Sequence, residues 1–89
     1  MDTRSALQTS LEQELAQAED WARQGRQQVE HQRRVVAILE RDGHDTAQAR
    51  ALLDTLLETQ ALHEDGVRRL VRELETLRAR GPGRRAGLY

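Results

Sequence analysis

The stretch that decides the fold is RDGHDTAQARALL, residues 41–53, near the middle of the 89-residue chain. On both sides of it the sequence is rich in Ala, Leu, Glu, Gln and Arg, which are all strong helix formers. Gly43 interrupts this composition, and glycine readily adopts the left-handed conformation that ends a helix. We therefore predict one helix before this stretch, one helix after it, and a corner at 42–45.

The corner also carries signals that end one helix and start the next. We expect His44 to fold back over Leu39, the apolar contact that often accompanies a glycine cap. Asp45 followed by Gln48 fits an N-cap whose partner amide bonds back to the backbone, a variant of the capping box. A connection this short makes two helices return antiparallel.

Each predicted helix carries one stripe of residues with the alternating spacings of three and four that mark a heptad pattern. The first stripe is Leu11, Leu15, Ala18, Ala22, Gly25, Val29, Gln32, Val36 and Leu39. The second stripe is Ala49, Leu53, Leu56, Gln60, His63, Val67, Leu70, Leu74 and Leu77. The fold class predicted is all-α: an antiparallel, coiled-coil-like hairpin with helices at about 4–42 and 46–80.

The outer ends of the two helices are marked less clearly than the corner. Two capping pairs are available for the start of the first helix, and both stay open: Ser5 with Gln8, and Thr9 with Glu12. The second helix should stop at Arg80, because the Gly-Pro-Gly sequence at 81–83 cannot continue it. Residues 1–80 then form the hairpin, and 81–89, GPGRRAGLY, are expected to form a flexible basic tail.

Folding the chain at the corner places opposite each other residues whose numbers add up to about 87 or 88. The pairs predicted are Val36 with Leu52, Leu39 with Ala49, Val29 with Thr59 or Gln60, Gly25 with His63, and Trp21 with Gly66. In the last two pairs, a mid-helix glycine makes room for a bulky side chain. Gln32, Gln60 and His63 also predict a polar layer within the apolar stripes, a feature that fixes register.

A lone two-helix hairpin covers only one side of each stripe. Val35, Ile38 and Leu57 have no predicted partner within the chain and form a candidate interaction surface. Small domains with thin cores commonly need oligomerisation. We therefore expect a homodimer that forms a four-helix bundle, with a monomeric hairpin as the alternative.

Composition excludes several classes of protein. The chain has no cysteine, so it has no disulfide, thiolate metal site or cysteine nucleophile. No apolar run approaches the ~20 residues needed to span a bilayer, and acidic residues interrupt the N-terminal region where a signal peptide would be apolar. The net charge of −1 gives no overall attraction to nucleic acid or membrane. We expect a soluble, cytoplasmic protein.

Motifs for chemistry are weak. No glycine-rich phosphate loop or metal-ligand spacing is present, so we predict no enzyme activity, cofactor or metal. Our main functional hypothesis is a protein–protein interaction module, an adaptor or regulator that binds itself and an unidentified protein. One alternative is histidine phosphotransfer, because His63 and Glu64 form the His-Glu pair found in many kinase H-boxes, although the rest of that motif is missing; His31 is a second candidate. Another is nucleic-acid association through Arg84 and Arg85 in the tail.

The run from residue 25 to 63 resembles a family of short uncharacterised helical-hairpin proteins of alphaproteobacteria, and GHDTAQARALL is its most specific part. The residues that carry the resemblance are Gly25, Gln32, Arg33, Leu39, Gly43, Asp45, Thr46, Ala49, Leu52, Leu53, Gln60 and His63. It covers somewhat under half of the chain. The resemblance implies the hairpin fold and no particular activity, cofactor or partner.

Overall fold

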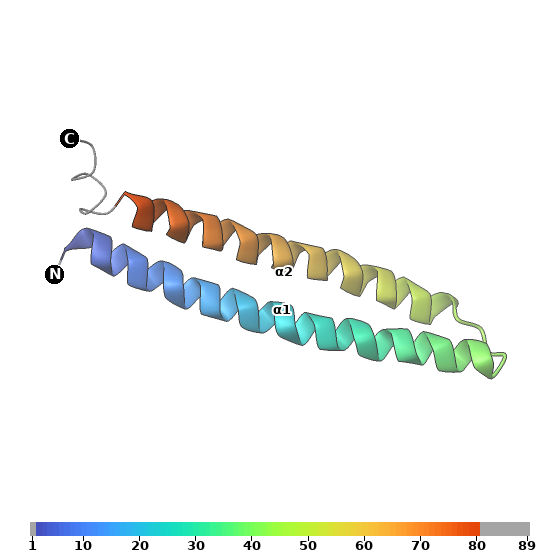
Figure 1. The fold of residues 1–89 in the computed structure, drawn as a ribbon. Coiled ribbons are helices and arrows are strands. Elements are labelled where there is room, and N and C mark those ends of the chain that lie inside the picture. The colour runs from blue at the N-terminus through green and yellow to red at the C-terminus, as the bar shows by residue number, and fades with distance from the viewer. Residues whose placement is uncertain (1, 81–89) are drawn as a thin grey trace.

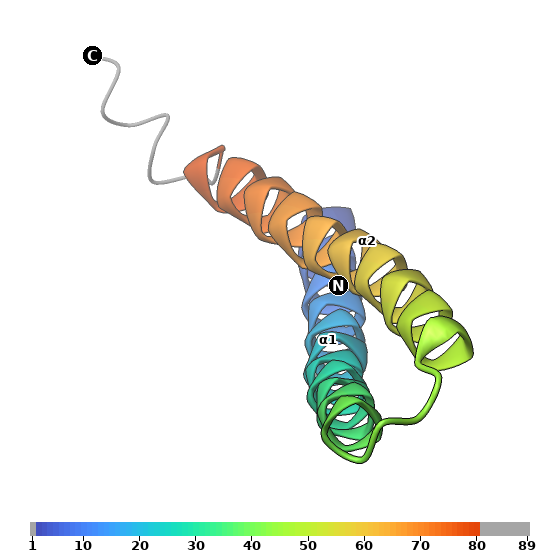
Figure 2. The same cartoon turned by 90° about the vertical axis from the view of Figure 1, so that its right-hand side faces the viewer.

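The computed structural model describes residues 2–80 and contains two long helices joined by a short turn (Figure 1). Helix α1 spans Thr3–Arg41 and helix α2 spans Ala47–Ala79. The helices run antiparallel, side by side, with the turn at one end of the hairpin (Figure 1). Viewed along the hairpin they cross at an angle (Figure 2). The predicted two-helix, all-α hairpin is confirmed, and the expected tail at 81–89 lies outside the described residues.

The two predicted stripes form the contact between the helices. Every residue of both stripes is buried or half-buried. A buried apolar cluster lies at the end of the hairpin opposite the turn and joins Leu11, Leu70 and Leu74, with Leu15, Ala18 and Leu77 packed around them. Burying one leucine side chain contributes about 1.5–3 kcal/mol. Within residues 2–80, no large side chain is completely enclosed, because each helix is covered on one side only.

The turn ends α1 in a Schellman motif. Gly43 has a φ of 76°, the left-handed conformation that costs glycine no Cβ clash. The His44 N–H donates to the Leu39 carbonyl at 2.9 Å, and the Gly43 N–H donates to the Glu40 carbonyl at 3.2 Å. These two bonds satisfy carbonyls that the end of a helix otherwise leaves unpaired. His44 is exposed and is tied to α1 through its backbone.

The start of α2 differs from the predicted capping box. Thr46, rather than Asp45, is the N-cap residue, and its side chain makes no capping hydrogen bond. Asp45 lies one residue too early, so its Oδ1 accepts the N–H of Ala47 at 2.9 Å, two residues along the chain. Gln48 is exposed on the first turn of α2. The Asp45–Gln48 box is therefore replaced by a turn centred on Thr46.

Helix α1 begins earlier than either predicted capping pair. Asp2 is its N-cap, and the carboxylate accepts the Ser5 N–H at 3.0 Å. This hydrogen bond lowers the pKa of the Asp2 carboxyl below its usual value. Ser5 and Thr9 consequently lie inside the helix.

At the same end, the Arg4 guanidinium donates to the Arg80 carbonyl at 2.7 Å and ties the start of α1 to the end of α2.

A substitution at Gly43 tests the turn. We expect Gly43→Ala to lower the free energy of unfolding by about 1 kcal/mol, because a Cβ is unfavourable at a positive φ. Gly43→Asn is the matched control and should lose less, since asparagine tolerates this conformation better. Urea titration followed by circular dichroism measures both variants. Equal stability of Gly43→Ala and the unmodified chain would contradict this turn geometry.

Candidate functional site

Two glutamines from the predicted polar layer are buried between the helices. Gln32 and Gln60 are each 7% exposed. The Gln32 amide donates to the Ala49 carbonyl at 2.9 Å, and the Gln60 amide donates to the Ala22 carbonyl at 2.7 Å. Each side chain therefore reaches the backbone of the other helix. A shift in register would leave both buried amides unpaired, which costs about 1–3 kcal/mol each.

Gln60, rather than the predicted His63, occupies the space over Gly25. A Cβ added to Gly25 would collide with the Gln60 side-chain amide. The Gln60 Nε2 donates to Ala22 and to the Glu64 carboxylate at 3.2 Å, while its Oε1 is buried without a hydrogen-bond partner. Gly25 therefore makes room for the side-chain amide of Gln60, which lies one helical turn before His63, the residue predicted to lie there.

His63 lies beside Trp21 instead. Their ring centroids are 6.4 Å apart and the ring planes are inclined by 39°. His63 is half-buried and Trp21 is 52% exposed. The predicted polar layer is therefore divided: the two glutamines are enclosed between the helices, and His63 lies at the edge with an aromatic neighbour.

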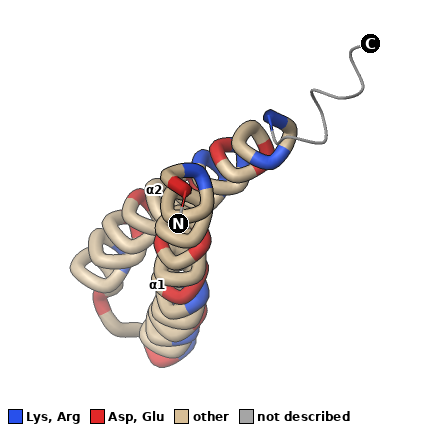
Figure 3. Tube along the Cα trace, turned by 90° about the vertical axis from the view of Figure 1, so that its left-hand side faces the viewer, with Lys and Arg blue, Asp and Glu red and all other residues tan. Residues whose placement is uncertain are grey.

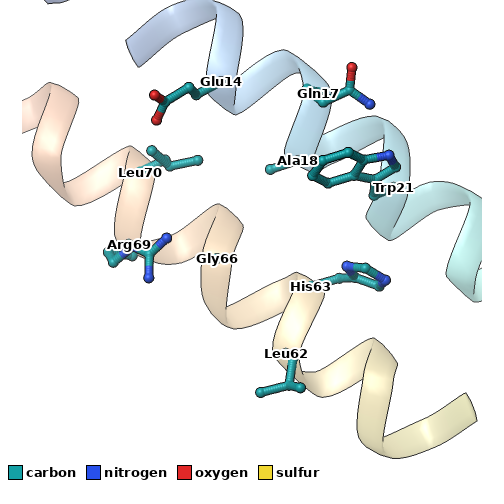
Figure 4. A pocket seen from close by; sticks show the side chains of 9 residues that line it. All are labelled: Glu14, Gln17, Ala18, Trp21, Leu62, His63, Gly66, Arg69 and Leu70. Carbon is teal, nitrogen blue, oxygen red and sulfur yellow. The ribbon is translucent and has the colours of Figure 1, made fainter.

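A groove of about 370 Å³ opens beside this aromatic pair (Figure 4). It is lined by Glu14, Gln17, Ala18, Trp21, Leu62, His63, Gly66, Arg69 and Leu70. Trp21 and Gly66 both line it, from opposite helices, but a Cβ on Gly66 would meet nothing within 4 Å. Gly66 therefore leaves a notch in the groove floor next to Trp21, where the sequence had predicted direct packing of the two residues.

The two long faces of the hairpin differ in charge. Acidic and basic residues occur along both helices (Figure 3). Three ion pairs join α1 to α2: Glu12 with Arg78, Arg26 with Glu64, and Glu40 with Arg50. If the stripes are heptad positions a and d, all six residues occupy position e and lie on one side of the stripes. We call this side the ion-paired face.

The opposite side, formed by heptad positions g and c, is the open face. Its large apolar side chains are Leu7, Trp21, Val35, Ile38, Leu52 and Leu62. All but the half-buried Val35 are strongly exposed, with Leu62 the most exposed at 72%. The groove beside Trp21 lies on this face. Among residues 2–80, no ion pair joins the two helices on the open face.

The candidate interaction surface is divided by the structure. Val35 and Ile38 belong to the open face by their heptad positions. Leu57 occupies position e and lines a separate hollow with Arg26 and Glu64, so it belongs to the ion-paired face. Leu62 is not among the surface residues predicted from the sequence. It occupies heptad position c, which lies next to position g, so the heptad pattern places it on the open face once the two faces of the hairpin are distinguished.

The exposed apolar side chains of the open face are suited to hydrophobic and van der Waals contacts. Its six large apolar side chains are interspersed with polar ones, and the charged groups that line the groove are Glu14 and Arg69. Within the described residues, no three His, Cys, Asp or Glu side chains come close enough together to hold a metal ion. None of the helices in this part of the chain has the length and apolar character needed to cross a membrane.

Comparison with known proteins identifies no relative. No protein-family model matches the chain, and neither curated proteins nor solved structures match it significantly. The resemblance of residues 25–63 to short alphaproteobacterial proteins therefore stays a prediction.

The contact between Gln60 and Gly25 is tested by a double-mutant cycle. We expect Gly25→Ala to destabilise the hairpin by about 1–3 kcal/mol, because the new methyl group overpacks the site. In the Gln60→Ala background the same change should become neutral or stabilising by up to ~1 kcal/mol, since alanine is the better helix former. Urea unfolding of the four proteins measures the coupling. The same loss in both backgrounds would contradict the contact.

Proposed function

We propose that the protein is a non-enzymatic protein–protein interaction module that acts as a homodimer. In this proposal the open faces of two hairpins pack together into a four-helix bundle. The observation that carries it is the segregation of the surface. Five of the seven exposed large apolar side chains lie on the open face, from Leu7 to Leu52, and the other two, Leu57 and Val71, lie on the face that carries the three inter-helix ion pairs of residues 2–80.

The thin core supports association. A chain of this size buries a smaller share of its surface than a larger domain, and small folds commonly gain stability from a second copy. The hairpin is 70 Å long and 26 Å wide. A face of these dimensions exceeds the ~800 Å² per partner that a stable interface covers. Burying apolar surface contributes about 25 cal/mol per Å², so the open face supplies a substantial driving force.

The ion-paired faces would then point outward from the bundle. Their mixed charges suit contact with another protein, which gives the dimer the role of an adaptor or regulator in the cytoplasm.

Other predicted roles have less support. His63, the proposed phosphate acceptor, is half-buried against Trp21, and Arg78 near the basic end of α2 is paired with Glu12 at 3.1 Å. Arg84 and Arg85 lie outside the described residues.

Two neighbouring substitutions on α2 test the dimer. Leu62→Glu places a charge on the open face, and Ala61→Glu places the same charge on an exposed position beside the ion-paired face. We expect the unmodified chain and Ala61→Glu to have twice the 10.2 kDa mass of one chain, and Leu62→Glu to shift toward the monomer. Analytical ultracentrifugation measures the masses. A monomeric unmodified chain would overturn the proposal, as would a Leu62→Glu variant as dimeric as the control.

A further inference from the structure

The middle of the open face combines a protrusion with a notch. Trp21 lies at the middle of α1 and is 52% exposed. Gly66, which lines the same groove from α2, leaves open space where any other residue would place a Cβ. Figure 4 shows the indole at one side of the groove and the bare Gly66 backbone at the other. The open face therefore carries a protruding side chain, Trp21, and a notch, at Gly66, at the same height, that is, at the same position along the length of the hairpin.

Symmetry limits how a second copy can use this contact. Most homodimers have a two-fold axis. If a residue of the first copy contacts a given patch of the second, the same residue of the second copy contacts the same patch of the first. Two hairpins packed face to face have two choices. An axis along the hairpin places α1 of one copy over α2 of the other and brings the turns together. An axis across the hairpin places α1 over α1 and sends the turns to opposite ends.

We propose that the homodimer is parallel, with its turns at the same end and Trp21 of each copy inserted over Gly66 of the other. This inference rests on the proposed dimer. An axis along the hairpin lays each residue of α1 over the residues of α2 at its own height. Trp21 and Gly66 share that height, so both protrusions meet both notches. The groove of about 370 Å³ has room for an indole, and Ala18 and Leu70 provide apolar contact in it.

The antiparallel dimer loses this match. An axis across the hairpin that keeps the two faces fully overlapped passes near the middle of α1, where Trp21 lies. Trp21 would then face Trp21 of the second copy, and Gly66 would face Gly66. Two protrusions would collide while two notches stayed empty, and unfilled space at an interface forfeits packing contacts.

A spin label at the turn distinguishes the two orientations. The chain has no cysteine, so His44→Cys gives a single attachment site at an exposed residue whose hydrogen bond to α1 uses only its backbone. In the parallel bundle, packed helices lie 8–10 Å apart, and we expect a label-to-label distance below ~30 Å by pulsed dipolar spectroscopy. In the antiparallel bundle the distance would approach the 70 Å length of the hairpin.

The mass of the labelled protein, measured on the same sample, separates the possible failures. A dimer with a short distance supports the parallel arrangement. A dimer with a distance near the full length overturns the orientation and leaves the proposed homodimer intact. A monomer without dipolar coupling overturns both.

Gly66→Leu tests the notch directly. Leucine is a better helix former than glycine, and its Cβ would meet nothing within 4 Å in the single hairpin, so the variant should fold. We expect its dimer Kd to rise at least tenfold, because the side chain occupies the site of the incoming indole. Ala61→Leu, away from the open face, is the matched control and should dimerise like the unmodified chain. A Gly66→Leu dimer of unchanged affinity would overturn the inserted Trp21.

Trp21 also reports on the contact without a label, because it is the sole tryptophan. Its fluorescence should shift to longer wavelength as the unmodified dimer is diluted and the indole returns to water. Gly66→Leu should show the long-wavelength emission at concentrations where the Ala61→Leu control does not. Emission that is independent of concentration across the dissociation range would contradict insertion.

Discussion

The contact of the Gln60 amide with the backbone of α1 constrains the rest of the hairpin. The amide is buried, so it needs a hydrogen-bond partner, and it finds one in the Ala22 carbonyl. It reaches that carbonyl only because Gly25 has no side chain. Gln32 makes the corresponding bond in the opposite direction, to Ala49 near the turn. Apolar stripes alone allow neighbouring registers of similar energy, whereas two buried amides in fixed positions favour one.

The surface follows from that register. With the two helices held in it, the e positions of α1 and α2 oppose each other, and acids meet arginines in three ion pairs along one face. Exposed pairs of this kind contribute little stability, about 0–1 kcal/mol each. Their main consequence is the contrast with the open face, where Trp21 and Leu62 remain exposed. A two-faced hairpin of this type is suited to association through one side.

Most of the fold could be predicted from the sequence, because heptad spacing and a glycine turn are local signals. Both stripes and the left-handed conformation of Gly43 are of this kind. The site was harder to predict. Gln60 and His63 lie on the same stripe one turn apart, so spacing does not decide which one lies over Gly25. Similarly, the N-cap of α2 at Thr46 rather than Asp45 depends on how far the turn extends.

Nuclear Overhauser contacts at the glycine of α1 test the hairpin register most directly. The structure predicts cross-peaks between the side-chain amide protons of Gln60 and the α protons of Gly25, together with cross-peaks between the Trp21 indole and the His63 ring. Cross-peaks from the His63 ring to Gly25, without those from Gln60, would show a different register and contradict the arrangement of both faces.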